Sequence, residues 1–357
     1  MITAISHHII KYHLEISTGL GSSYLTPVTA SDMLHLYVPT TDISTLTDPT
    51  LTDPSLQVTP SFSIELFIKN DDAIQFYTGF ETYHILNICF QFLGDAVDHL
   101  QYRGSKAKPT VHLESRGAPR VLTPLNEFFL VLCRLRCALM ENDLAYRFGI
   151  SHSTVCRIFI TWINFLFFKF KDINLWPSRQ QVDNFMPQVF KDSYPTTRCI
   201  IDATEIFIQT PSNPQAQQLT FSSYKNHNTL KALVAVTPSG AVSFVSKLYG
   251  GNISDRELTE RSGLLDLLEP GDSVMADRGF TIADLLDVKG VALNIPPMKV
   301  SDQFTQRELT TTRRIATLRI HVERAIGQIK NFKLLSDIPN KNSRPNIFCL
   351  YNAFKFS

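Results

Sequence analysis

The sequence lacks a long apolar run, a secretion leader and paired cysteines, and each absence excludes a class of protein. The longest lipid-like stretch, residues 158–168, is too short to span a membrane and is followed by Lys169 and Lys171. No charged segment precedes an apolar one at the start of the chain, so secretion is not supported. The 6 cysteines include no pair separated by two residues. We therefore expect free core thiols in a reducing compartment, and Cys133 and Cys137 do not predict a zinc site.

Net charge alone excludes little, because it is only +1 over 357 residues, but the charges are unevenly distributed. The first 110 residues are acidic, whereas residues 313–344 carry eight basic side chains against Glu323 and Asp337. A basic stripe of this kind suits a phosphate backbone, and the alternative is a solvated helix face. With 44% hydrophobic and 19% charged residues, the chain can form a sizeable core and about two ordered domains.

Shifts in composition divide the chain into five segments. The first is rich in Ser, Thr, Pro and Asp, has no periodicity, and predicts a disordered leader. A short helical segment with a linker follows, then a helix-turn-helix, a mixed α/β domain and an irregular tail. The predicted bounds of these segments are 1–63, 64–112, 118–176, 195–335 and 336–357.

Three helices are predicted in the third segment. Thr123 and Pro124 begin the first as a capping hydroxyl followed by proline at the first helical position. Residues 141–148 form a short second helix that ends at Gly149, and Ser151 caps a third helix. This spacing fits a helix-turn-helix.

The start of the third helix is where such a motif meets DNA. It would present Ser153, Thr154 and Arg157, which can bond base edges or phosphates. The alternative is a three-helix cluster that only packs on the next domain or dimerises.

One carboxylate lies inside a run that otherwise predicts a buried strand. Asp202 is surrounded by β-branched and aromatic residues in the stretch Cys199–Gln209. An unpaired carboxylate in such a place would cost several kcal/mol, so it must be neutralised, paired or bound to a cation. Lys225 or Lys231 could pair with it. Glu205, three residues later, faces the opposite side of the strand and is not an expected ligand.

Two more acidic residues complete a recognisable set. Asp277 follows the apolar part of a second strand, residues 272–280, and could simply begin the turn at Gly279. Glu323 lies on a basic helix predicted over residues 313–332, where it could instead form an ion pair with the arginine four residues earlier.

The remaining elements between these acids are predicted from periodicity and turn residues. The predicted elements are a connector over 176–194, a hairpin of strands 219–236 and 241–248, a crossover helix capped by Ser254, a helix near 282–286 and a strand at 291–295. Periodicity alone indicates only a mixed α/β domain.

Longer motifs carry a resemblance to a known family. They are the run from Ser222 to Ile282, which begins SSYKNHNTLKALVAVTPSG and contains ADRGF, then Asn294-Ile-Pro-Pro, and RIHVERAIGQIKNFKLL from Arg319. The chain resembles the DDE superfamily endonucleases, the transposases of the PIF/Harbinger type and their host-domesticated relatives. The resemblance covers about residues 198–335, with a weaker extension back to about Phe76.

The resemblance implies a fold and a set of site residues. The fold is an α/β fold, a ribonuclease-H-like mixed five-stranded sheet with flanking helices, preceded by the all-α helix-turn-helix region and the disordered leader. Asp202, Asp277 and Glu323 would be catalytic and would bind two divalent cations, Mg²⁺ or Mn²⁺. Beyond the helix-turn-helix residues, the expected DNA contacts are Lys225, Arg319, Arg324 and Lys330.

The resemblance also implies a function. We expect a metal-dependent endonuclease that cleaves double-stranded DNA at transposon ends, with strand transfer as a further step. A domesticated, non-catalytic DNA-binding or scaffold protein is one alternative, and a ribonuclease is another. The expected partners are double-stranded DNA, a separate DNA-binding protein and a second copy of the chain, with no membrane. The expected location is the nucleus, with the cytoplasm as the alternative.

Overall fold

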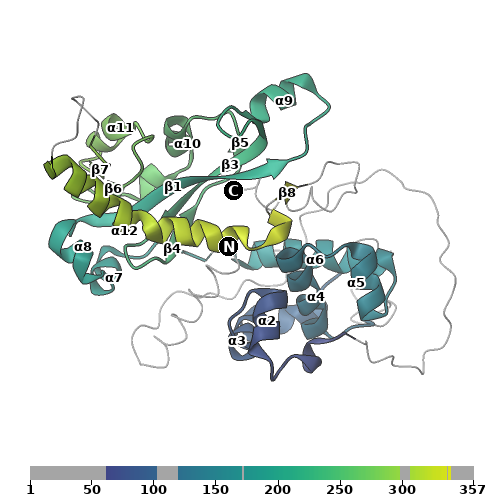
Figure 1. The fold of residues 1–357 in the computed structure, drawn as a ribbon. Coiled ribbons are helices and arrows are strands. Elements are labelled where there is room, and N and C mark those ends of the chain that lie inside the picture. Colours follow the sequence, from purple (N-terminus) through teal and green to yellow (C-terminus); the bar gives the residue numbers. More distant parts are fainter. Residues whose placement is uncertain (1–61, 103–119, 171–172, 298–305, 336, 339–357) are drawn as a thin grey trace, which may run out of the picture.

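The computed structural model describes residues 62–102, 120–170, 173–297, 306–335 and 337–338. They form a helical part and a sheet with flanking helices, which lie side by side in Figure 1. The predicted leader lies outside the described residues except at its end, where Phe62 and Ser63 are buried rather than part of a leader. Most of the predicted tail also lies outside the described residues.

The helical part is built from short elements around one aromatic core. Its members are η2 (Ile64–Leu66), α2 (Asp71–Thr78), α3 (Tyr83–Leu93), η3 (Gly94–His99), α4 (Pro124–Cys137), α5 (Glu141–Phe148) and α6 (His152–Phe170). Phe128, Phe129 and Trp162 are fully buried at its centre. The apolar positions of α4 and α6 face one another, so burial of these large side chains is what holds the helices together.

The predicted helix boundaries in this part are confirmed. The side chain of Thr123 accepts a hydrogen bond from the Asn126 amide and caps α4, whose first residue is Pro124. Helix α5 ends at Gly149, which adopts a φ of 64° that an L side chain would disfavour. The Ser151 hydroxyl accepts from the amide of Thr154 at 3.2 Å and caps α6.

Helix α6 is long and apolar enough to cross a membrane by length and composition alone. Its apolar residues nevertheless pack inward, and 56% of its most apolar 18-residue stretch is buried inside the protein. The Trp162 indole also donates a hydrogen bond of 2.8 Å to Glu127 on α4. These contacts are those of a core helix.

The second part is organised by a mixed sheet. Its strands are β1 (Thr197–Ile208), β2 (Phe221–Ser222), β3 (His227–Val236), β4 (Val242–Val245), β5 (Tyr249–Gly250), β6 (Ser273–Met275), β7 (Ala292–Asn294) and β8 (Asp337–Ile338). The main path runs β2-β3-β1-β6-β7, with β4 and β5 paired to β3 and β8 paired to β1. The β1–β3 and β3–β4 pairs are antiparallel, whereas β6 pairs parallel to both β1 and β7. The five longer strands therefore follow the order β4-β3-β1-β6-β7, which is the ribonuclease-H-like arrangement.

Helices cover both faces of this sheet. Helix α12 (Gln306–Lys330) crosses one face, as Figure 1 shows, and there its Leu318 and Val322 share a core with Ile200 of β1. On the other face, Ile201 packs with Leu258 of α10 (Asp255–Arg261). Alternate residues of β1 thus point to opposite cores, as strand geometry requires. The face toward which each acid of β1 points is fixed by this alternation.

Several predicted elements differ in detail from the structure. The connector over 176–194 contains two helices, α7 (Arg179–Asn184) and α8 (Gln188–Ser193). The first arm of the predicted hairpin begins in a helix, α9 (Pro214–Thr220), because Asn213 caps it and Pro214 begins it. The crossover helix α10, capped by Ser254, and α11 (Ala283–Asp287) lie where they were predicted.

The end of α12 joins the two parts of the protein. After α12, η5 (Lys333–Leu335) packs on α4, and the Phe332 ring is buried in the core of the helical part. The Arg136 guanidinium of α4 lies over that ring, 5.5 Å from its centre. The helix that carries Glu323 is therefore anchored at one end in the helix-turn-helix region.

Candidate active site

Asp202 lies in the middle of β1, on the face that α12 covers. It pairs in register with Val234 and follows Ile200 by two residues, so both share one side of the strand. Its Oδ1 accepts a hydrogen bond of 2.9 Å from the Ala203 amide. Burial raises the pKa of this carboxyl, and the neighbouring Asp277 and Asp255 raise it further, whereas Arg319 and the Ala203 amide lower it. A carboxylate placed in this way favours a nearby cation.

Asp277 comes two residues after the end of β6. Strand β6 is the parallel neighbour of β1, and Ile200 pairs with Met275. Continued by two residues, this register would bring Asp277 opposite Asp202, and the charge of Asp277 does act on the Asp202 carboxyl. The side chain of Asp277 is 56% exposed, so it lies at the solvent edge of the site while Asp202 lies deeper.

Arg319 supplies the positive charge beside these two aspartates. Its Nη1 lies 3.0 Å from Oδ1 of Asp277, and its own side chain is only 10% exposed. The Nε atom of Arg319 has no hydrogen-bond partner although it is buried. Arg319, which was expected among the DNA contacts of the basic stripe, is turned inward to the acidic residues.

Lys231 does not pair with Asp202, although either Lys225 or Lys231 was a possible partner. The Lys231 ammonium lies 2.7 Å from Asp255 and donates to the Ile253 carbonyl. Lys225 is exposed and lies over the ring of Tyr224. Asp255 also acts on the charge of Asp202, a role that was not predicted from the sequence.

Glu205 points away from the acidic residues, as predicted. Its carboxylate accepts a hydrogen bond of 2.7 Å from the Thr229 hydroxyl, and Thr229 is fully buried. The residue pairs in register with Lys231, whose side chain also lies on the face of the sheet away from α12. Glu205 therefore has a structural partner and no access to Asp202.

Glu323 lies on α12, one helical turn after Arg319, and is exposed. Residues four apart share roughly one side of a helix, so Glu323 lies one turn beyond Arg319 on that side of α12. The alternative ion pair between Glu323 and Arg319 is not formed, because Arg319 pairs with Asp277. Among the described residues, one group of three ligand side chains has its atoms within 4.8 Å of one another, and it is not this acidic trio. The structure thus brings Asp202 and Asp277 close together, whereas Glu323 lies on the helix that crosses this face and has no described contact with either aspartate.

His321, two residues before Glu323 on α12, takes part in packing and not in the acidic site. Its ring packs against Phe190 and comes close to the turn at Gly240. Burial and the nearby Arg324 lower the pKa of His321, so it is neutral at physiological pH. Its contacts make it part of the packing of α12.

The predicted DNA contacts fall into two groups in space. On α6, Arg157 is exposed, whereas the hydroxyls of Ser153 and Thr154 lie 2.9 Å from that of Ser151 at the helix cap. On α12, Arg324 and Lys330 are exposed. No described contact tests their binding to DNA.

The residues of the site fit a hard divalent cation. Its side-chain donors are carboxylate oxygens, which Mg²⁺ and Mn²⁺ prefer over nitrogen or sulfur. The site also has an excess of negative charge. Its three carboxylates, those of Asp202, Asp277 and Asp255, are offset by only two cationic side chains, those of Arg319 and Lys231. A cation between the first two carboxylates would offset the burial, and the smaller repulsion, that raise the pKa of Asp202.

Comparison with protein families gives two matches. A model described as DDE superfamily endonuclease matches residues 201–351, and a model described as helix-turn-helix of DDE superfamily endonuclease matches residues 120–172. The first match extends beyond the predicted domain end at residue 335, so the tail belongs to the matched region as far as residue 351. The chain matches none of the curated proteins and none of the solved structures with which it was compared.

Proposed function

We propose, because the chain belongs to the DDE superfamily endonucleases and carries their helix-turn-helix, that Asp202, Asp277 and Glu323 make it a divalent-metal-dependent DNA nuclease. The observation that supports this best is the position of Asp202 on β1 and of Asp277 just after the end of its parallel neighbour β6, where Arg319 of the helix that carries Glu323 meets Asp277. Carboxylates fixed on strands hold their positions with little reorganisation.

Each side chain of the site would have a role set by its position, either in holding metal or in balancing charge. When bound, a divalent metal pair supplies an activated water and stabilises the leaving oxyanion. Asp202 presents buried oxygens whose charge is costly without a cation, and Asp277 presents an oxygen at the solvent edge. Arg319 offsets their repulsion and would be available to a phosphate once a cation takes its place beside Asp277.

DNA would approach along two basic surfaces. The exposed Arg157 on α6 would contact one stretch of duplex, with Ser153 and Thr154 beside it. Arg324 and Lys330 on α12, together with Lys225, would contact the backbone near the acids. Since Phe332 anchors α12 in the helical part, the two surfaces would keep a fixed position relative to each other.

The substrate we propose is a duplex at a transposon end, followed by strand transfer. Cleavage would use Mg²⁺ or Mn²⁺, and the location would be the nucleus. A second copy of the chain and a separate DNA-binding protein would complete recognition of the ends.

A non-catalytic DNA-binding scaffold is the second candidate, and one observation favours it. Asp277 is already neutralised by Arg319 at 3.0 Å, so the acidic residues do not strictly need a cation to fold together. In a scaffold of this kind, DNA would bind to the helix-turn-helix and no strand would be cut.

The test is cleavage of labelled duplex DNA by the full chain with Mg²⁺ or Mn²⁺. Asp202→Asn, Asp277→Asn and Glu323→Gln should each reduce cleavage to background. Asp266→Asn is the matched control, because Asp266 is an exposed acid whose partner is Lys289 and not a residue of the site, and it should cleave normally. Equal cleavage by the parent and the three site variants would reject the nuclease assignment. Salt-sensitive binding without any cut product would support the scaffold instead.

Specificity needs a second comparison. The duplex should carry the ends of the element that encodes the chain, and a shuffled duplex of equal length and composition should serve as the control. Preferential cleavage of the first supports the transposon-end substrate, whereas equal cleavage of both argues against it.

A further inference from the structure

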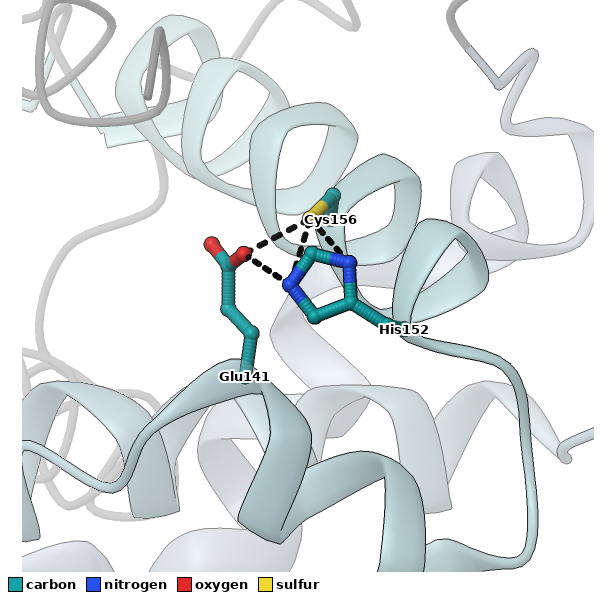
Figure 2. Close-up of side chains that lie close together, drawn as sticks. All are labelled: Glu141, His152 and Cys156. Carbon is teal, nitrogen blue, oxygen red and sulfur yellow. Dashed lines mark hydrogen bonds and ion pairs between the residues drawn. The ribbon is translucent and has the colours of Figure 1, made fainter. Parts of the chain in front are cut away.

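Three side chains that can bind a metal meet between the start of α5 and the start of α6 in the helix-turn-helix. Glu141 is the first residue of α5, and His152 and Cys156 lie in the first turns of α6. Figure 2 shows the three side chains converging across the gap between the two helices. Their ligand atoms all lie within 4.8 Å of one another. The cluster is independent of the acidic residues on the sheet.

The distances within the cluster are short. Oε2 of Glu141 lies 2.9 Å from Nε2 of His152 and 2.8 Å from Sγ of Cys156. Sγ lies 3.8 and 3.9 Å from the two ring nitrogens of His152. Ligands of a tetrahedral zinc ion, with bonds of about 2.0–2.3 Å, lie roughly 3.4–3.6 Å apart. To bind an ion, the Glu141 carboxylate would therefore have to move less than about 1 Å away from the His152 ring and the Cys156 sulfur.

The backbone and a buried arginine already position these groups. His152 and Cys156 are four residues apart, which places both on one side of α6. On the other helix, Oε1 of Glu141 accepts a hydrogen bond of 2.9 Å from Nη2 of Arg134, whose side chain is only 10% exposed. The arginine thus holds one oxygen of the carboxylate and directs the other toward the imidazole and the thiol. Carboxylates that bind metals are in turn held by hydrogen bonds of this kind, which fix their orientation.

The chemistry of the donors selects the metal. Thiolate sulfur and imidazole nitrogen suit Zn²⁺ and similar borderline ions, whereas Mg²⁺ and Mn²⁺ prefer oxygen. The His152 side chain is 29% exposed, so the cluster is open to solvent on that side. Three protein ligands and one water would complete a tetrahedral shell.

We propose that Glu141, His152 and Cys156 form a Zn²⁺ site that ties α5 to α6. Binding releases the thiol proton of Cys156 to solvent, and the thiolate, the imidazole and Oε2 of Glu141 then share the ion. The ion bridges the segment 141–156, which contains the turn at Gly149, so it fixes the angle between the two helices. The first turn of α6 also carries Ser153 and Thr154, which places the ion next to the proposed DNA contacts.

The competing explanation is a hydrogen-bonded network without any ion. In that arrangement the Cys156 thiol and the His152 ring both donate to Glu141, and Arg134 neutralises the carboxylate. The two explanations differ in the state of the Cys156 sulfur, which is a thiol in the network and a metal-bound thiolate in the zinc site. A test should therefore detect a bond between the sulfur and a metal.

The experiment is a Co²⁺ titration of the metal-stripped full chain, with Co²⁺ as a spectroscopic substitute for Zn²⁺. We expect one equivalent to produce a thiolate-to-cobalt charge-transfer band, and Zn²⁺ to remove it by displacement. Cys156→Ser should abolish the band, and His152→Ala should weaken binding at least about tenfold. Cys137→Ser is the matched control, since Cys137 is a half-buried cysteine of the same helical part whose Sγ lies 3.5 Å from the Phe76 carbonyl, outside the cluster, and it should keep the band.

Two results would overturn the proposal. One is a parent chain that binds Co²⁺ without a thiolate band, and the other is a band that survives Cys156→Ser. If Cys156→Ser does not fold, X-ray absorption at the zinc edge of the parent chain decides the question without a variant. A shell that includes one sulfur supports the site, and a shell of nitrogen and oxygen alone rejects it. Asp202→Asn should leave the band unchanged, so this outcome is separate from that of the nuclease test.

Discussion

Arg319 of α12 places Nη1 3.0 Å from Oδ1 of Asp277, at the end of the strand next to β1. The pair brings the helix and the sheet together at the point where two aspartates would otherwise repel each other. Because Asp277 is half exposed, the pair itself stabilises the fold by no more than about 1 kcal/mol. Its larger effect is on Asp202, whose pKa the guanidinium holds down against burial.

Arg319→Gln should make the folded protein more dependent on a divalent cation. Without the guanidinium, the repulsion between Asp202 and Asp277 is uncompensated, and Asp277 has no internal competitor for a metal. We expect the variant to have a lower Tm than the parent in the absence of metal and a larger increase in Tm on addition of Mg²⁺. Thermal unfolding at matched ionic strength measures both. An equal Mg²⁺-induced increase in the two proteins would contradict the assigned role.

Asp202→Asn should stabilise the metal-free protein at neutral pH. The folded state raises the pKa of Asp202 above its ordinary value of 3.8, so the folded state binds a proton more tightly than the unfolded state. Stability therefore falls as the pH rises from about that value through the raised pKa, and the loss is complete above it. Removing the charge should recover roughly 1 kcal/mol at pH 7 and nothing at a pH below 3.8.

The measurement is urea unfolding of parent and variant over a pH series in the presence of a chelator. Glu205→Gln serves as the control on the same strand, because its carboxylate is hydrogen bonded to Thr229 on the opposite face and should not become more stable when neutralised. A variant whose advantage persists unchanged into acid would contradict the electrostatic explanation.

The sequence was sufficient for the helix-turn-helix and for the position of two acids. Thr123, Pro124 and Gly149 are local signals, since a cap, a fixed φ and a left-handed residue act within one turn. Asp202 inside an apolar strand and Asp277 after another were equally visible. Their meeting follows from the parallel pairing of β1 and β6, which came from the resemblance and not from periodicity.

Contacts between distant segments were not predictable from local patterns. Arg319 looked like one base in a basic stripe, and only its burial beside Asp277 shows its direction. The cluster at Cys156 was also missed, although the HSTVC segment places a His and a Cys four residues apart on one helix face. The third ligand, Glu141, comes from another helix, so the set emerges only when the angle between the helices is known.

Phe332→Ala should uncouple α12 from the helical part. The ring is 4% exposed, belongs to the core of the helical part, and is covered by the Arg136 guanidinium. Removing a buried Phe side chain costs about 3–5 kcal/mol through lost burial and a residual cavity. We expect the helical part to unfold at lower urea than the sheet, as two separate transitions in tryptophan fluorescence and circular dichroism.

Phe76→Ala is the control for this change. Phe76 is 61% exposed on α2, so its removal should alter the unfolding free energy by less than about 1 kcal/mol. A single transition shared by the parent and Phe332→Ala, with the same midpoint, would show that the anchor does not couple the two parts.

Arg157→Ala should weaken duplex binding and reduce its salt dependence. Arg157 is exposed on α6, near the cap at which Ser153 and Thr154 lie, so its guanidinium can reach a phosphate without reorganisation. Loss of one phosphate contact lowers the slope of log affinity against log salt by about 1. Arg261→Ala is a matched control, because Arg261 is an exposed arginine that ends α10 and pairs with Glu257. Fluorescence anisotropy of a labelled duplex over a salt series measures both slopes, and an unchanged slope for Arg157→Ala would place the DNA surface elsewhere on the protein.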